Sequence, residues 1–243
     1  MDIQSAINVR HSRRAYDGKG LALEDAVKLH DLVTEYSKVP GVDIRFITNN
    51  GVAFNGVTKS YGIFTGVNDY FLLIRNKDNP KSSIKLGYYG ELLVLRCTEM
   101  GLNTCWVGAT FSARDFNVTL DDDQVVECAI TVGHSPKRHT VHENLIHMIY
   151  HPRTKKVSDM YTSEAESVPD WFLKGMAAVQ RAPSAFNRQP AHFIYHKDGT
   201  VSVQSKDVET IGSLGIDIGI AKLHFEIGSG RKFTSDTKVN SNL

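Results

Sequence analysis

One long helical segment limits the folds that are open to this chain. Residues 83–100 show helical periodicity, and Gly101 stands where a left-handed C-cap residue belongs. Apolar side chains recur along this segment on more than one side, at Leu86, Tyr89, Leu92, Leu93, Leu95 and Cys97. A helix that is apolar on several sides needs other elements to cover those sides. The sequence therefore predicts a central helix that is buried on more than one face.

Shorter elements surround this helix, and they predict a fold with both helices and strands. Helical spacing of apolar residues predicts a helix over 23–36, with Pro40 as a stop. Extended apolar runs predict strands over 43–48, 69–74 and 125–132, and the last of these reads as fully buried.

A second series of elements follows residue 160, where an acidic, small-residue stretch (163–169) predicts a linker. The later elements follow the same order as the earlier ones. They are a helix over 169–181, a strand over 192–196, a turn at Asp198-Gly199, a strand over 200–204, and a helix over 214–227 ended by Gly228. The long helices of both halves end in a similar way, which is a weak internal repeat. Residues 229–243 have no apolar period and predict a frayed tail.

Composition excludes several partners. The chain carries 28 basic and 27 acidic residues, so no bulk field attracts nucleic acid or acidic lipid, and a bound anion needs a local cluster. Charged residues near the amino terminus interrupt the apolar segment that a signal peptide needs, and all apolar runs are too short to span a membrane. We therefore expect a cytoplasmic protein with no membrane span. The three cysteines form no CxxC pair and are interpreted as reduced, packed thiols.

Two basic clusters could bind an anion. Residues 10–14 bring together Arg10, Ser12, Arg13 and Arg14, whose guanidinium and hydroxyl groups can donate to phosphate oxygens. A second basic pair, Arg153 and Lys155, follows the predicted strand and Pro152. Each cluster alone is more often a solvated basic surface than a phosphate site.

Two further segments are suited to contact a flat ligand. Residues 101–109 leave the long helix with small residues around one tryptophan, and small residues let backbone N–H groups approach a ligand closely. Residues 182–190 form a loop with a proline near each end and short polar side chains between them. Taken singly, the first segment is more often a helix-to-strand turn, and the second is uninformative.

Together these segments resemble the FMN-dependent nitroreductase family. RHSRR (10–14) resembles the family's arginine-serine phosphate motif, GLNTCWVG (101–108) is similar to its flavin-edge loop, and APSAFNRQP (182–190) closely matches its Pro-Ser-x-x-Asn-x-Gln-Pro loop. The resemblance implies an α+β nitroreductase-like fold with a central, mostly antiparallel sheet flanked by helices.

The order of the motifs departs from ordinary members, in which the Pro-Ser loop precedes the central helix and reaches the flavin of a partner chain. Here that loop comes last, so the resemblance is to the single-chain, internally duplicated branch. Residues 1–160 would form the first half, 161–228 a shorter second half that replaces the partner, and 229–243 a flexible tail. We therefore expect one FMN site per chain in a monomeric pseudo-dimer or weak homo-oligomer.

The resemblance also implies roles for individual residues. Arg10, Ser12, Arg153 and Lys155 would bind the FMN phosphate, and Arg14 would lie near the pyrimidine edge, where a cation stabilises reduced flavin. The remaining expected contacts come from the two other motifs, at Trp106, Val107, Gly108, Ala109, Pro183, Ser184, Asn187 and Gln189. Backbone N–H groups of Gly108 or Ala109 would face flavin N5 and O4.

The implied activity is hydride transfer from NADPH or NADH, through flavin N5, to small electron-poor acceptors, with no catalytic side chain. The alternative is a non-catalytic FMN-binding or FMN-sequestering protein, because Asn103 and Ala109 replace common glycines and Phe186 could block the flavin face. A third alternative is a different ligand altogether. Metal binding by His142, His147 and His151 is not expected, since no HExxH pattern accompanies them.

Overall fold

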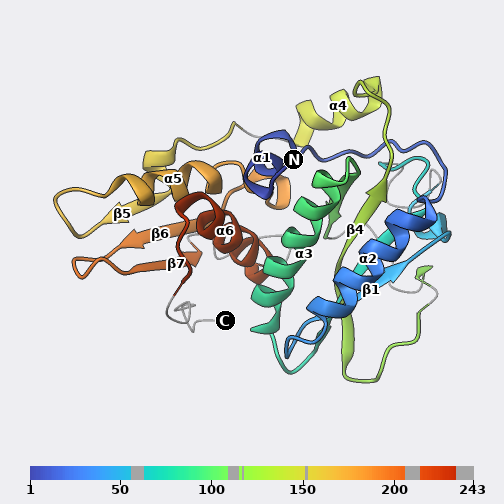
Figure 1. Ribbon diagram of the computed structural model, residues 1–243, viewed down its shortest axis with the longest axis horizontal. Helices are drawn as coiled ribbons and strands as arrows, with labels where there is room; N and C mark the ends of the chain where they lie inside the picture. Colours follow the sequence, from blue (N-terminus) through green and yellow to red (C-terminus); the bar gives the residue numbers. More distant parts are fainter. Residues whose placement is uncertain (56–62, 109–114, 117, 151–152, 206–213, 234–243) are drawn as a thin grey trace.

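The computed structural model shows an α+β chain in which two groups of elements meet at a pair of long helices (Figure 1). The structure describes residues 1–55, 63–108, 115–116, 118–150, 153–205 and 214–233. No described helix is both long and apolar enough to cross a membrane.

The larger sheet belongs to the first half of the chain. It contains β1 (Asp43–Ile47), β2 (Asp69–Asn76), β3 (Asn103–Val107) and β4 (Gln124–Gly133). Their order is β1-β2-β4-β3, and all neighbours are antiparallel. The sheet therefore confirms the mostly antiparallel arrangement that the family resemblance implies.

Both faces of this sheet are covered, which explains the nearly continuous apolar sequence of β2. Alternate residues point to opposite faces of a strand. Phe71 and Leu73 pack with α2 (Leu23–Tyr36) and α3 (Ser82–Glu99), whereas Tyr70 and Leu72 pack with loop residues on the other face. A strand buried on both sides loses the polar alternation of a surface strand.

The second half builds a smaller sheet. Strand β6 (Ala191–Tyr195) pairs in parallel with β5 (Tyr161–Ser163) and antiparallel with β7 (Val201–Ser205). Helices α5 (Asp170–Val179) and α6 (Leu214–Ser229) share one apolar core with this sheet.

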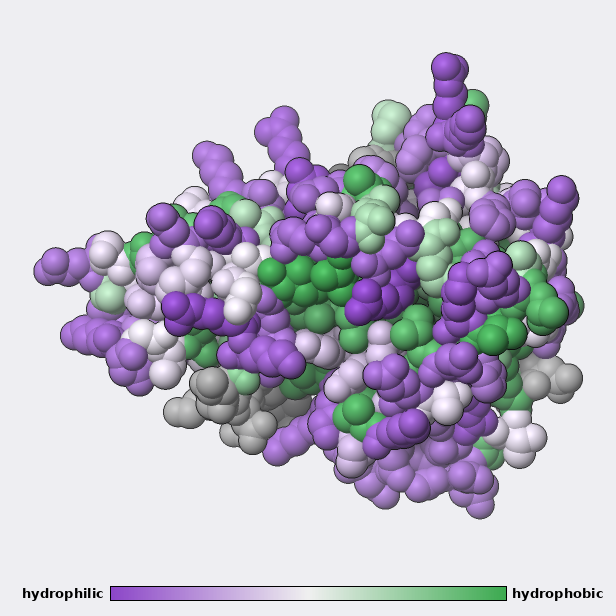
Figure 2. All heavy atoms as spheres, viewed as in Figure 1, coloured by the Kyte–Doolittle hydropathy of each residue, from purple (hydrophilic) through white to green (hydrophobic). Residues whose placement is uncertain are grey.

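Helices α3 and α6 join the two groups and pack unusually closely. A Cβ atom at Gly87 would collide with the carbonyl oxygen of Ile216, and one at Gly219 would collide with that of Ile84. Only glycine permits this backbone approach. In Figure 2 apolar side chains gather over α6 and the neighbouring part of α3, with hydrophilic residues around them.

Two short helices complete the fold. Helix α1 (Ile3–Val9) packs Ala6 and Ile7 where α3, α5 and α6 meet, and α4 (Val141–Tyr150) lies above the first half in Figure 1. Helix α1 was not predicted, although Asp2 caps its first turn by accepting from the Ser5 N–H at 2.8 Å.

Most predicted elements agree with the structure to within two residues, and α3 is confirmed as a central helix. Two predictions were wrong, and one strand was not predicted. Residues 103–107 form strand β3 and not a loop, and the unpredicted strand β5 ends at Ser163, the first residue of the predicted linker. Gly228 does not end α6, because it lies inside the helix against Ala178, and the left-handed residue is Gly230.

Candidate functional site: a basic cleft between the two halves

The arginine-rich segment after α1 is extended and joins the larger sheet. Ser12 forms a parallel bridge with Thr104 of β3, and the Arg13 N–H donates to the Thr104 carbonyl at 3.0 Å. Extended backbone sends alternate side chains to opposite sides. Ser12 and Arg14 line a cleft together with Arg10 and His11, whereas Arg13, between Ser12 and Arg14, is buried on the other side.

Arg13 has a structural role that holds this segment in place. Its guanidinium pairs with Glu143 of α4 at 3.1 Å and donates to the carbonyl oxygens of Pro136 and Arg138. Glu143 also accepts from the N–H groups of Arg14 and Ala15. Burial alone would raise the pKa of Glu143, but the Arg13 side chain and these N–H groups lower it to about 2.

The loop of residues 182–190 has an unusual backbone. Phe186, Asn187 and Gln189 have φ angles of 52°, 53° and 49°, in the left-handed region that non-glycine residues rarely occupy. The loop is held from within, because the Gln189 N–H donates to Ser184 Oγ at 2.9 Å. Strained backbone of this kind is maintained by its surroundings and is frequent at binding sites.

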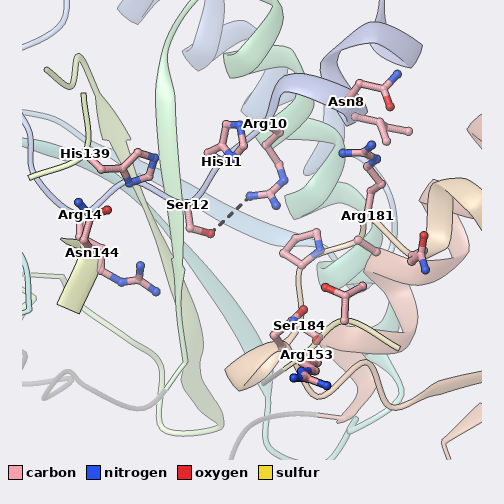
Figure 3. Close-up of a pocket in the computed structure, with 16 residues that line it drawn as sticks. Asn8, Arg10, His11, Ser12, Arg14, His139, Asn144, Arg153, Arg181 and Ser184 are labelled. Carbon is pink, nitrogen blue, oxygen red and sulfur yellow. Dashed lines mark hydrogen bonds between the residues drawn. The ribbon is translucent and has the colours of Figure 1, made fainter. Parts of the chain in front are cut away.

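These two segments, far apart in sequence, meet at one cleft of about 710 Å³ (Figure 3). Its lining residues come from α1, the arginine-rich segment, the region around α4, and the loop after α5. They are Ile7, Asn8, Arg10, His11, Ser12, Arg14, His139, Asn144, Arg153, Thr154, Gln180, Arg181, Ala182, Pro183, Ser184 and Asn187. The volume falls within the range of roughly 300–1,000 Å³ of small-molecule and cofactor sites.

The cleft is strongly basic although the whole chain is nearly neutral. Of the described residues, four arginines and two histidines line it, and no aspartate or glutamate does. Within the described part of the chain, no carboxylate pairs with the side chains of Arg14, Arg153 or Arg181. Gathered cations without counter-charges repel one another and attract an anion. The arrangement is that of an anion-binding site.

Two expected contacts, Lys155 and Gln189, lie outside the lining of the cleft. The Gln189 side chain accepts from the Lys155 N–H at 2.8 Å and donates to the Gln180 carbonyl at 3.0 Å. Lys155 Nζ donates to the Gln189 carbonyl at 3.0 Å. Because both ends of the Gln189 amide are occupied by backbone, this residue fixes the loop and does not offer its side chain to a ligand.

The described part of the flavin-edge segment (101–108) also lies outside the lining of the cleft. Trp106 and Val107 belong to β3, and neither they nor Gly108 line the cleft. Trp106 Nε1 donates to Glu91 Oε2 at 2.8 Å, and Val107 is buried in the core. Ala109 lies outside the described residues. Trp106 packs against the apolar core between the sheet and α3, and Val107 belongs to the core on the other face of the sheet.

A buried polar network lies beneath Arg10. Glu91 of α3 and His224 of α6 are fully buried, and their Oε1 and Nε2 atoms are 2.9 Å apart. Arg10 Nε lies 3.9 Å from the same carboxylate, and Arg10 also donates to Ser12 Oγ at 3.4 Å. The network connects the cleft to the crossing of α3 and α6. Sequence reasoning missed both Glu91 and His224.

Asp217 of α6 supports the loop from below. Its carboxyl accepts from the Ala185 N–H at 3.3 Å. Burial raises the pKa of Asp217 to about 7, and the Ala185 hydrogen bond only partly opposes this. The folded protein therefore keeps this proton up to about pH 7, whereas the unfolded chain releases it near pH 4.

The Asp217→Asn variant is expected to lose less stability than the natural protein as pH rises from 5 to 8. The unfolded state binds fewer protons in this window, so ionisation of Asp217 destabilises the folded state as pH rises. One pKa unit corresponds to about 1.4 kcal/mol, so the two units between pH 5 and the folded-state pKa of about 7 give an effect of about 3 kcal/mol. Urea unfolding of both proteins at pH 5 and pH 8 measures it. Parallel pH profiles would contradict the assignment.

Other expectations concern cysteines and histidines. Cys97, Cys105 and Cys128 are free and buried, and burial raises the pKa of each thiol, as expected for packed cysteines. The described residues contain no group of three or more side chains that could hold a metal ion. The side chains of His142 and His147, and all of His151, lie outside the described residues.

Comparison with known proteins identifies the protein family and the fold. A family model described as "Putative TM nitroreductase" matches residues 2–229. A crystal structure from Thermotoga maritima, described as a putative nitroreductase, is similar with a TM-score of 0.64 and 19% identity, over 96% of this chain and 87% of that one. The fold is therefore the nitroreductase fold.

Two clostridial structures are similar over a smaller share of this chain. A nitroreductase family protein from Clostridium difficile 630 has a TM-score of 0.49 and 18% identity, over 68% of this chain and 99% of that one. An FMN-dependent nitroreductase from Clostridium difficile R20291 has a TM-score of 0.43 and 17% identity, over 60% and 96%. No curated protein matches.

Because the family model covers nearly the whole described chain, the protein belongs to this nitroreductase family.

Proposed function

We propose that this chain is an FMN-dependent oxidoreductase that uses NADPH or NADH to reduce small electron-poor acceptors. The observation that carries the proposal is the meeting of the arginine-serine segment and the Pro-Ser loop at one basic cleft. Seven of the residues expected to contact the cofactor line this cleft, namely Arg10, Ser12, Arg14, Arg153, Pro183, Ser184 and Asn187.

The cleft has the donors that a flavin mononucleotide requires. Arg10 and Arg153 would hold the phosphate together with the Ser12 hydroxyl, and Ser184 and Asn187 would contact the cofactor from the second half. The Arg153 guanidinium has no carboxylate partner among the described residues, so it can gain charge-assisted hydrogen bonds to a dianion without leaving a carboxylate behind. Bound FMN would supply the hydride transfer between nicotinamide and acceptor.

Residues of this chain would tune and support that chemistry. Arg14 would place a cation near the pyrimidine edge, where negative charge collects on reduction. The Arg13–Glu143 pair fixes the backbone of Arg14, so the cation is held in place before ligand binds. Phe186 is 39% exposed and lies against the Arg188 guanidinium, outside the cleft lining, so its ring leaves the cleft open.

The chain would act as a pseudo-dimer with one cofactor site. The two halves contribute different lining residues to the same cleft, and each supplies motifs that the other lacks. The second half thus replaces the partner subunit of ordinary family members, and the protein would be a monomer or a weak homo-oligomer.

A simple experiment tests the proposal. Purified protein is expected to be yellow with one FMN per chain, and anaerobic addition of NADPH or NADH is expected to bleach it. A protein that stays yellow with both nucleotides would be a non-catalytic FMN-binding protein. A protein that neither retains nor rebinds FMN would refute the cofactor assignment.

A further inference from the structure

One cation of the cleft is left without a role by the proposed cofactor contacts. Arg10, Arg14 and Arg153 have roles at the phosphate or the pyrimidine edge, but Arg181 has none. It lies just after α5 in the second half and lines the same cleft. A mononucleotide carries a single phosphate, so a fourth arginine exceeds what that group needs.

The position of Arg181 is well defined by its backbone. Its N–H donates to the Ala178 carbonyl at 3.0 Å, and the next residue, Ala182, is buried in the core. In Figure 3 Arg181 lies near Asn8, and Arg14 lies at the other end of the cleft. Among the described residues no carboxylate pairs with the Arg181 guanidinium.

The surroundings of Arg181 are polar and cationic. Asn8 and His11 line the same cleft from the first half. The pKa of His11 is lowered by partial burial and by nearby basic residues, of which Arg10 has the largest effect and Arg181 the smallest. A neutral imidazole and an amide beside an unpaired guanidinium can all donate to one anionic group.

We propose that Arg181, with Asn8 and His11, forms a second anion subsite at the rim of the cleft. It takes the anionic oxygen group of the molecule that exchanges electrons with the bound cofactor, and the inference thus rests on the proposed function. Two ligands could supply this anionic group: NADPH through its 2′-phosphate, and the electron acceptor through a carboxylate. A guanidinium binds either group through two parallel hydrogen bonds.

Matched ligand pairs test the subsite on the FMN-loaded protein. Calorimetric titration compares 2′,5′-ADP with 5′-AMP, which differ in the 2′-phosphate, and 4-nitrobenzoate with 4-nitrobenzamide, which differ in the carboxylate. The more anionic member of one pair is expected to bind at least about tenfold more tightly. Arg181→Ala should abolish that difference, and Arg181→Lys should restore part of it.

Lys174→Ala provides the matched control, because it removes one exposed cation from α5 outside the cleft. This variant should discriminate as the natural protein does. If the natural protein discriminates within neither pair, or if Arg181→Ala retains FMN and discriminates as the natural protein does, the subsite is refuted and the proposed function stands. If the natural protein holds no FMN, the proposed function fails and the subsite fails with it.

Discussion

Replacing Arg10 and Arg14 together with alanine is expected to weaken FMN binding so far that the protein is purified without flavin. Both side chains line the cleft, and Arg14 has no carboxylate partner among the described residues. Losing two charge-assisted contacts costs on the order of 2–5 kcal/mol, a factor of roughly 30 to several thousand in affinity. Flavin absorbance per chain and titration of the apoprotein with FMN measure the loss.

A charge-matched control separates this effect from a change in net charge. Lys19→Ala with Lys38→Ala removes two exposed cations away from the cleft and should retain full flavin content. Melting temperatures show whether the double arginine variant remains folded, since Glu91 keeps His224 and Trp106 as partners. A folded double variant that binds FMN with unchanged affinity would show that these arginines do not hold the cofactor.

Two kinds of evidence in the sequence predicted the helices and the residues that line the cleft. Periodicity is local, so α2 was predicted at its observed bounds and α3 within one residue. The meeting of Arg10 with Asn187 could not come from periodicity, and it was predicted from motif resemblance alone. The cleft shows that both residues line one cavity.

Other features were missed because their causes are non-local. Glu143 pairs with Arg13, which lies 130 positions away in the sequence, and no local sequence pattern predicts such a partner. His224 and Asp217 do leave a signal, since each is a polar residue in a largely apolar helix, but this pattern does not identify the residues that they contact. Gly228 looked like a helix end, whereas its actual role is close contact with α5.

Replacing His224 with leucine is expected to lower the free energy of unfolding by about 3–5 kcal/mol, because it leaves a buried carboxylate without its main partner. His224 and Glu91 are both 0% exposed, and the Arg10 side chain lies 3.9 Å from the carboxylate. The change also deprives the Ala178 carbonyl of the His224 Nδ1 contact at 3.0 Å. Urea unfolding at neutral pH measures the difference.

The double variant Glu91→Met with His224→Leu distinguishes a lost ionic partner from a simple packing defect. Apolar replacement of both members of a buried pair removes the uncompensated carboxylate, so the double variant should be more stable than His224→Leu. We expect a coupling free energy of about 2 kcal/mol or more between the two positions, beyond what independent sites show. Additive losses in this double-mutant cycle would mean that the two side chains only fill space. Strong coupling would instead show that α3 and α6, and with them the two halves that form the cleft, are joined through the polar contact beneath Arg10.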